Sequence, residues 1–134
     1  MTQPMVSYVK AINTIYLPVS DIVKSTDWYV NNLHLELLNK VNAESTQAQL
    51  KICLGQTIFL IKTAEKRNLT FVEVDGHEQC ILTLEVTNIK EFHEGLKRNL
   101  VDVEDIQDNG ECGLSFYVKD PDGNKIDIWG GWGH

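Results

Sequence analysis

The chain carries the same strand-and-helix unit twice, and this repeat limits the folds open to it. Residues 12–19 read as a strand, and Ser20-Asp21 then offers an N-cap before apolar residues at helical spacing. The pattern returns at residues 80–86 and Asn88. The 67-residue shift from Asp21 to Asn88 also superimposes other apolar residues: Leu17 on Leu84, Val19 on Val86, Ile22 on Ile89 and Leu33 on Leu100. One shift that aligns both elements indicates an internal duplication.

Further strand-like runs complete both halves of the chain. They are residues 35–41, 47–54 and 57–62 in the first half, and 101–106, 113–118 and 124–129 in the second. Each half therefore reads as β-α-β-β-β, which predicts one α+β domain over residues 1–134, with a first unit at 12–62 and a second at 80–129. Residues 63–79 read as a linker carrying one short extra strand, and residues 130–134 as a flexible, glycine-rich tail that carries Trp132.

The segment Phe116 to Trp129 contains the most specific turn of the sequence. Asp120, Pro121 and Gly123 supply the side-chain acceptor, fixed φ and flexible exit that a type I turn prefers. Side chains alternate along a strand, so Asp127 points to the face opposite its two isoleucine neighbours. An acid beside Trp129 on that face predicts a lined cavity.

These patterns together resemble the vicinal oxygen chelate superfamily, which includes glyoxalase I, extradiol dioxygenases and bleomycin-resistance proteins. The resemblance rests on Ile15-x-Leu-x-Val-x-Asp21, on Leu84-x-Val-x-Asn88 and on Phe116-x-Val-x-Asp-Pro-Asp-Gly-Asn-x-Ile-Asp-Ile128. It implies that the two units form a partly open eight-stranded roll around a cup. In this family function resides in the cup, often between two subunits, so the resemblance also implies a homodimer.

Metal-dependent members of that family commonly carry a His seven residues before the acid that opens each helix. Here those positions hold Thr14 and Ile81, and residues 58–61 offer only apolar side chains where the family places a carboxylate. Asp127 alone remains of the usual four ligands, whereas a catalytic metal needs about three protein ligands. We therefore predict no cofactor, although the resemblance leaves room for a divalent metal.

The four histidines do not converge by any sequence spacing. His93 lies one residue beyond the apolar stripe of its helix, and this position predicts a partly exposed surface histidine.

Strand alternation places six candidate ligand-binding side chains on the inner face of the cup. Glu85 is unexpected there, because a mid-strand carboxylate is costly to bury without a partner. It either contacts a ligand or lies at a wet cup mouth, paired with Lys125. Asp127 likewise either contacts a ligand or pairs across the sheet. The candidates are Tyr16, Thr83, Glu85, Tyr117, Asp127 and Trp129.

Composition narrows the range of partners. The net charge of −7, without a basic cluster, argues against nucleic acid. No apolar run approaches the length of a membrane span, and residues 1–10 lack the layout of a signal peptide. Three widely spaced cysteines indicate neither a disulfide framework nor a zinc knuckle. These features predict a cytoplasmic protein without a membrane partner.

Three functions remain open at this point. The first is a metal-free protein that binds a small amphipathic or cationic molecule in an acidic, aromatic-lined cup. The second is a lyase or dioxygenase whose divergent metal ligands polarise vicinal oxygens. The third is a non-catalytic interaction domain, which a cavity in the structure would disfavour.

Overall fold

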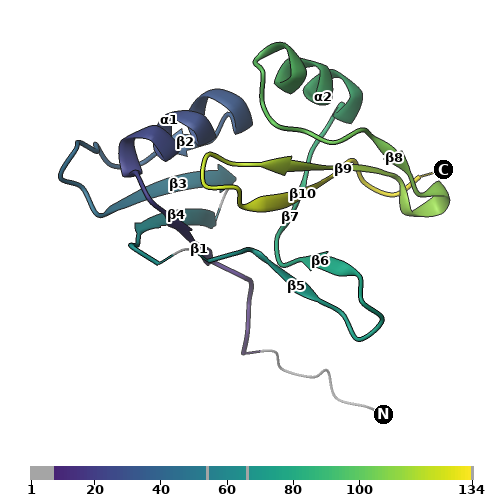
Figure 1. The fold of residues 1–134 in the computed structure, drawn as a ribbon, viewed down its shortest axis with the longest axis horizontal. Coiled ribbons are helices and arrows are strands. Elements are labelled where there is room, and N and C mark those ends of the chain that lie inside the picture. Colours follow the sequence, from purple (N-terminus) through teal and green to yellow (C-terminus); the bar gives the residue numbers. More distant parts are fainter. Residues whose placement is uncertain (1–7, 54, 66, 134) are drawn as a thin grey trace.

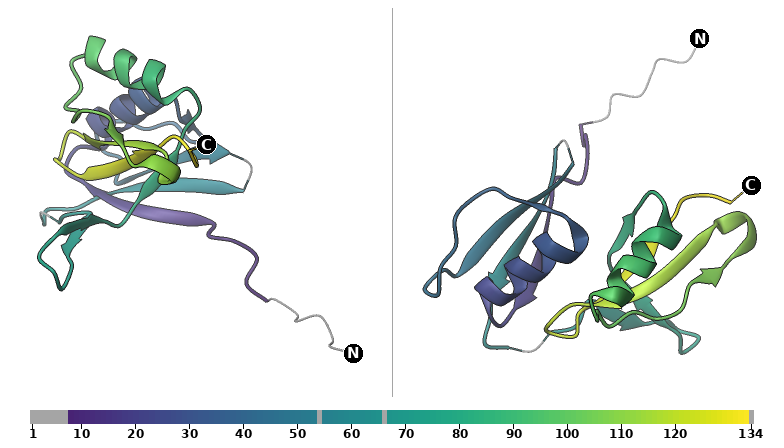
Figure 2. Two further views of the ribbon diagram at one scale, coloured as in Figure 1. Left: turned by 90° about the vertical axis from the view of Figure 1, so that its right-hand side faces the viewer. Right: turned by 90° about the horizontal axis from the view of Figure 1, so that it is seen from above.

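Two four-stranded sheets, each with one helix packed on it, form the protein (Figures 1 and 2). The computed structural model describes residues 8–53, 55–65 and 67–133. Both helices lie on the same side of the sheets, and the two units stand side by side (Figure 2). The predicted α+β class and duplicated β-α-β-β-β architecture are confirmed.

The first unit is a mixed sheet covered by α1. Its elements are β1 (Thr14–Val19), α1 (Ile22–Leu33), β2 (Glu36–Leu37), β3 (Gln47–Cys53) and β4 (Gln56–Lys62). The strand order is β1-β4-β3-β2, with β1 parallel to β4 and the other pairs antiparallel. Alternation buries Leu17 and Val19 of β1 with Ile58 and Leu60 of β4, so the helix side of this sheet is apolar.

The second unit repeats this topology. Its elements are β7 (Thr83–Glu85), α2 (Ile89–Arg98), β8 (Gln107–Asp108), the 3₁₀ turn η1 (Gly110–Cys112), β9 (Leu114–Lys119) and β10 (Lys125–Trp129). The order β7-β10-β9-β8 mirrors that of the first sheet, and β7 is parallel to β10. Ile126 and Ile128 are fully buried toward α2, as the alternation of β10 predicts.

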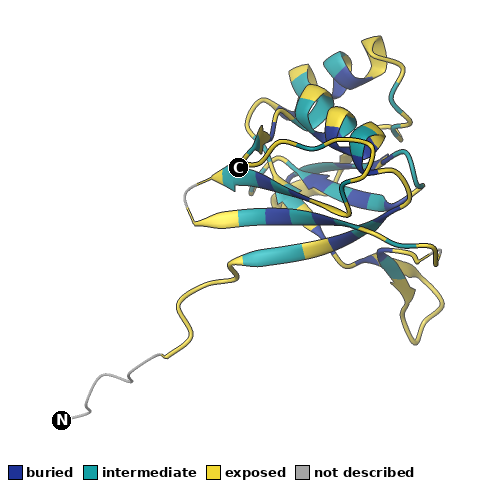
Figure 3. Ribbon diagram, turned by 90° about the vertical axis from the view of Figure 1, so that its left-hand side faces the viewer, coloured by how far each residue is buried: buried dark blue, intermediate teal, exposed yellow. Residues whose placement is uncertain are grey.

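A hairpin connects the units where one short strand was expected. It consists of β5 (Thr70–Val72) and β6 (Glu78–Cys80), which pair antiparallel. The hairpin projects away from both sheets and is largely exposed (Figures 1 and 3). The strand predicted over residues 80–86 is therefore divided between β6 and β7. Between these two strands, the backbone N–H of Ile81 donates to the carbonyl of Leu69.

Two other predicted strands are shorter than their sequence patterns indicate. The strand predicted over residues 35–41 stops at Leu37, because the side chain of Asn39 accepts the N–H of Gln49 and takes the place of a ladder bond. Residues 101–106 form only a bridge at Val103, and β8 follows them.

The helix starts differ between the units. Asp21 caps α1 as predicted, because its carboxylate accepts the N–H of Lys24 at 3.1 Å. The same prediction is wrong for Asn88, which has φ 51° and makes no side-chain cap bond to α2. A left-handed residue cannot place its side chain over the first turn of the helix as an extended N-cap residue does.

His93 is buried, so the prediction of a surface histidine is wrong. Only 7% of the residue is exposed, and its Nε2 lies 2.8 Å from the carbonyl oxygen of Glu104. The ring also packs edge-on against Phe116. The segment after α2 folds back over the helix, and it covers a side chain that helical periodicity alone places at the edge of the apolar stripe.

The Asp120–Asn124 turn is held by its own first residue. The Asp120 carboxylate accepts the backbone N–H groups of Asp122 and Asn124, and the N–H of Gly123 donates to the Asp120 carbonyl. Gly123 has φ 79°, which a glycine adopts without strain. The predicted reversal of the chain between β9 and β10 is confirmed.

The same turn also fastens the second unit to the first, in a contact that we call the clasp. Three hydrogen bonds form it. The Tyr29 hydroxyl donates to the Asp120 carboxylate at 2.7 Å, and the Asn124 side-chain amide donates to the Pro18 carbonyl at 3.0 Å. The backbone N–H of Ser20 donates to the Asp122 carboxylate at 3.1 Å. Asp120 and Asn124 are buried. These bonds, of which the one between Tyr29 and Asp120 is fully buried, join residues about a hundred positions apart and hold the two units together.

The C-terminal residues pack on the second unit. The N–H groups of Gly130 and Gly133 donate to the carbonyls of Leu114 and Glu111. A Cβ on Gly113 would overlap the carbonyl oxygen of Gly131, so glycine at position 113 permits the close approach.

Candidate functional site

A row of three polar side chains crosses the face of the second sheet that points away from α2. Thr83 of β7, Asp127 of β10 and Tyr117 of β9 are direct neighbours in the strand register. The Thr83 hydroxyl donates to the Asp127 carboxylate at 2.8 Å. We call this side the cup face, because it is where the sequence places the cup. The structure therefore brings three of the six predicted side chains together.

The next row along the same strands holds Glu85 and Trp129. These two are register partners in the parallel pair of β7 and β10. Glu85 is exposed, so its carboxylate avoids the burial cost that made it unexpected in the sequence. The Trp129 indole N–H donates to the carbonyl of Cys112 at 2.7 Å, and Trp132 packs edge-on against its ring. An acid and a fixed aromatic ring thus stand side by side.

Lys125 occupies the other end of the cup face and pairs away from Glu85. Its Nζ lies 2.9 Å from Glu78 of the hairpin, 3.4 Å from Glu104 and 4.3 Å from the centre of the Tyr117 ring. The hydrogen bond that Lys125 donates to Glu78 raises the pKa of Lys125, so the ammonium stays charged. The predicted pairing of Lys125 with Glu85 is not the one that forms, and Glu85 is left for other partners.

Electrostatics keep the Tyr117 hydroxyl protonated. Burial raises its pKa above the usual range, and the nearby Asp127 carboxylate raises it further. At neutral pH the row therefore presents a carboxylate between a hydroxyl group and a phenol, which can accept a hydrogen bond and attract a cation.

Tyr16 lies on the first unit and joins a different neighbour. Its ring stacks on Phe59 at 5.6 Å between centroids, and 66% of the residue is exposed. Phe59 lies on β4, beside Tyr16 in the strand register. Tyr16 thus adds aromatic surface to the first sheet, and no contact with the Asp127 row is present among the described residues.

A crevice of about 720 Å³ opens between the two units. Thr83 and Glu85 line it from β7, together with Ile52 of β3, Phe92 of α2 and residues at the end of α1. Such a volume is within the range of ligand sites in proteins. Thr83 and Glu85 thus stand at the boundary of the cup face and this crevice.

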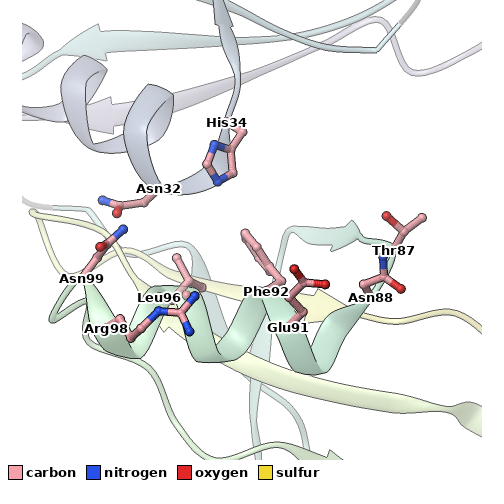
Figure 4. Close-up of a pocket in the computed structure, with 10 residues that line it drawn as sticks. Asn32, His34, Thr87, Asn88, Glu91, Phe92, Leu96, Arg98 and Asn99 are labelled. Carbon is pink, nitrogen blue, oxygen red and sulfur yellow. The ribbon is translucent and has the colours of Figure 1, made fainter.

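A second hollow, of about 360 Å³, lies where the end of α1 meets α2 (Figure 4). Asn32 and His34 face it from α1, while Phe92 and Arg98 face it from α2 (Figure 4). It shares His34, Thr87 and Phe92 with the larger crevice, so the two hollows are neighbours.

The donor set of the cup face does not fit the metal of the metal-dependent relatives. Thr14, at one expected ligand position, is hydrogen-bonded to Thr57, and Phe59 fills the carboxylate position of the first unit with an aromatic ring. Ile81 is apolar. Asp127 contributes one carboxylate, whereas a site of this kind needs about three suitable ligands.

Within the described ranges, three potential metal ligands do come together elsewhere. Glu73, Asp75 and His77 lie at the exposed turn of the hairpin, with ligand atoms within 4.8 Å of one another. His77 already pairs with Asp75 at 3.1 Å. Exposed acidic groups commonly gather in this way without an ion, and this turn is remote in sequence from Asp127.

Two paired β-α-β-β-β units with ligand-type side chains on one face define the class of glyoxalase-fold proteins. The chain belongs to the Glyoxalase/Bleomycin resistance protein/Dioxygenase superfamily, whose pattern it matches over residues 11–128. No curated protein matches it significantly by sequence. No helix in the described part of the chain is long and apolar enough to cross a membrane.

Solved structures share this fold at low sequence identity. The antibiotic-binding protein TnmS3 from Streptomyces sp. CB03234 has a TM-score of 0.72 and 20% identity, over 94% of this chain and 99% of that one. Lactoylglutathione lyase from Agrobacterium tumefaciens gives 0.70 and 20%, over 96% and 100%. The fosfomycin resistance protein FosX from Listeria monocytogenes gives 0.70 and 17%, over 92% and 94%. These likenesses show a common fold.

Sequence reasoning missed the partners that hold the cup face in place. Glu78 and Glu104 fix Lys125, but they lie in a linker and in a loop whose positions no periodicity specifies. The backbone carbonyl of Cys112 orients Trp129 by accepting its indole N–H. Backbone acceptors leave no signal in a sequence.

Proposed function

We propose that this protein binds a small amphipathic cation on its cup face, without a metal of the family type. The observation that carries the proposal is the row Thr83–Asp127–Tyr117, which presents a carboxylate beside an aromatic ring on three adjacent strands. Glu85 and Trp129 repeat the combination of acid and ring in the next row. A carboxylate and a ring face both attract a cation, the ring by about 0.5 to 2 kcal/mol. Lys125 already lies over the Tyr117 ring, so we assign the ring contact of a ligand cation to Trp129, beside Glu85.

The similarity to TnmS3 supports a binding role, because that protein is described as antibiotic-binding. The similarity to a lactoylglutathione lyase keeps metal-dependent chemistry as the competing function. The side chains at the expected ligand positions, Thr14, Phe59 and Ile81, favour the metal-free function. A homodimer and a cytoplasmic location are further parts of this proposal. The dimer is supported by apolar side chains exposed on the hairpin and on β1.

Thermal-shift measurements with paired probes test the proposal. Benzyltrimethylammonium and benzenesulfonate carry similar rings and opposite charges, so we expect only the cation to stabilise the protein. A cation present at about 100 times its Kd adds about 2.7 kcal/mol, which corresponds to a rise in Tm of roughly 10 °C. Asp127→Asn removes the charge and keeps the shape, so the rise should disappear.

Asp27→Asn is the matched control, because Asp27 is exposed on α1, on the helix side of the first sheet. It removes the same charge and should leave the cation effect intact. Stabilisation that survives both Asp127→Asn and Glu85→Gln would contradict binding at the cup face. Stoichiometric Ni, Mn, Fe or Zn in protein grown with these metals would instead favour the metal-dependent alternative.

A further inference from the structure

The two units carry equivalent turns, and among the residues that the structure describes a clasp forms at one of them. The turn between Lys51 and Thr57 corresponds to the turn between Lys119 and Lys125, because both follow a paired position of the last two strands and contain the same number of residues. Gly55 and Gly123 hold the same place, with φ values of 77° and 79°. The fold thus has two equivalent positions at which a turn of one unit could bond to the other unit.

The residues of the clasp are replaced by apolar ones at the second location. Asp120 corresponds to Ile52 by its place in the turn, and Tyr29 corresponds to Leu96 by the 67-residue repeat. Ser25, whose hydroxyl also donates to Asp122, corresponds to Phe92 in the same way. The hydrogen-bonded pair of one end therefore has no counterpart at the other.

The crevice of about 720 Å³ lies at this second location. It is lined by Ile52 and Gln56 of the second turn, by Phe92 of α2, by Leu84 of β7 and by Val86, which follows β7. Leu84, Val86 and Phe92 pack against the apolar core and are only partly buried. Apolar residues that remain half-exposed at an interface between units favour a ligand that completes their burial.

The charge of the lining selects the kind of ligand. Among the described residues that line the crevice, Glu85 is the one that carries a formal charge when histidine is neutral. Arg98 faces the neighbouring hollow instead (Figure 4). An anionic ligand would meet Glu85 without a cation to offset the repulsion, whereas an N–H group would find an acceptor there.

We propose that the crevice between the units is a second binding site, which adjoins the cup face at Thr83 and Glu85 but does not include Asp127, and that it takes a hydrophobic amine. The apolar body of the ligand lies against Ile52, Leu84 and Phe92, and its N–H group donates to Glu85 at the mouth. We infer that the site exists because the repeat supplies two equivalent turns at the interface between the units. Polar residues join the units at the Asp120–Asn124 turn, and apolar residues replace them at the other turn.

A pair of fluorescent probes tests this site. N-phenyl-1-naphthylamine is a hydrophobic amine, and 8-anilinonaphthalene-1-sulfonate has the same skeleton with an added anionic group. We expect saturable binding of the amine, seen as a rise in its emission on direct excitation, and binding of the sulfonate about tenfold weaker or less. Glu85→Gln should narrow that difference, since it removes the repelling charge.

A blocking variant locates the amine. Gln56 is exposed at the crevice, so Gln56→Trp should weaken amine binding about tenfold. Gln107→Trp places the same ring on β8, at the far edge of the second sheet, and should leave the affinity unchanged. Equal effects of the two variants, or sulfonate binding as tight as that of the amine, would overturn the proposal. Unfolding curves for each variant verify that it is folded.

Asp127→Asn separates this site from the cup face. The substitution should abolish stabilisation by benzyltrimethylammonium and leave the affinity for N-phenyl-1-naphthylamine unchanged. Loss of amine binding in Asp127→Asn would place the amine on the cup face and contradict a separate site. Gln56→Trp should in turn retain stabilisation by the small cation, so either proposal can fail without the other.

Discussion

Asp120 combines two tasks in one buried carboxylate. It organises its own turn through the N–H groups of Asp122 and Asn124, and it accepts the Tyr29 hydroxyl from the first unit. Burial raises its pKa, and the hydrogen bonds from Tyr29 and Asn124 act in the opposite direction. Because the folded-state pKa is raised, the contribution of this group to stability is largest at low pH and is lost as pH rises through that pKa.

Tyr29→Phe tests the clasp. It removes the donor to Asp120 and leaves the buried carboxylate short of one partner, so we expect a loss of about 1 to 3 kcal/mol in the free energy of unfolding at pH 7. The Tyr29 bond favours the charged form of Asp120, so the pKa of Asp120 should rise further in the variant. The loss should therefore shrink in acid, where the carboxyl group is protonated. Urea unfolding at neutral pH and at about pH 4 measures both effects.

Tyr16→Phe is the matched control for this prediction. It deletes the same hydroxyl from a side chain that is largely exposed, and it should change stability by less than about 0.5 kcal/mol. A penalty for Tyr29→Phe that is the same at both pH values would show that the hydroxyl does not act through the ionised form of Asp120.

The helices and strands match the sequence-based predictions where a single periodicity determines them. They differ from the predictions where a side chain forms a local hydrogen bond or the backbone adopts a left-handed conformation. The cap of α1 and the alternation along β10 are as predicted. The strand expected at 35–41 is cut short by the side chain of Asn39, and α2 starts from a left-handed Asn88 without a cap. Local hydrogen bonds of this kind compete with regular structure, and residue type alone does not reveal which will form.

The packing of the C-terminal segment on β9 leads to a prediction at this scale. Gly113→Ala would drive its Cβ into the carbonyl oxygen of Gly131, so the segment must move away. Gly113 has φ 81° and ψ −168°, a backbone region that is essentially restricted to glycine, and we expect a greater loss of stability than the roughly 1 to 3 kcal/mol of such backbone strain alone. The contact of Trp132 with Trp129 should also be lost, which near-ultraviolet circular dichroism detects.

Gly123→Ala supplies the comparison for Gly113→Ala. Gly123 has nearly the same φ, 79° against 81°, but a Cβ added to it would meet nothing within 4 Å. This variant should show the backbone strain alone and keep the tryptophan signal. Equal losses in the two variants would mean that the C-terminal segment does not pack against Gly113 in solution.

At the scale of the whole molecule, exposed apolar side chains lead to a prediction about assembly. Val72 and Val74 of the hairpin and Ile81 beside it are exposed, together with Tyr16 on β1. Apolar clusters of this kind mark interaction sites. We expect a homodimer by size-exclusion chromatography with light scattering. The double substitution Val72→Asp and Val74→Asp should shift it to monomer.

Leu100→Asp is the control for this prediction. Leu100 is 92% exposed at the end of α2, away from the hairpin, and its substitution should leave the dimer intact. A monomeric natural sequence, or dissociation by Leu100→Asp alone, would contradict the proposed interface.

The sequence by itself determined the duplicated architecture, the faces of the strands and the Asp120–Asn124 turn. Each of these depends on spacing within a short stretch, so periodicity and turn chemistry suffice to predict it. Thr83 and Tyr117 were predicted on the same face as Asp127 for the same reason, since alternation fixes the face of a strand once its helix side is known, and the register of the strands in the structure makes them its neighbours.

The tertiary structure alone decided the contacts that join distant segments. It closed one end of the interface between the units with Tyr29 and Asp120 and left the other end open beside Ile52 and Phe92. It buried His93 and directed Lys125 to Glu78. These contacts depend on how segments far apart in the sequence meet in space, and no spacing along the chain encodes that meeting.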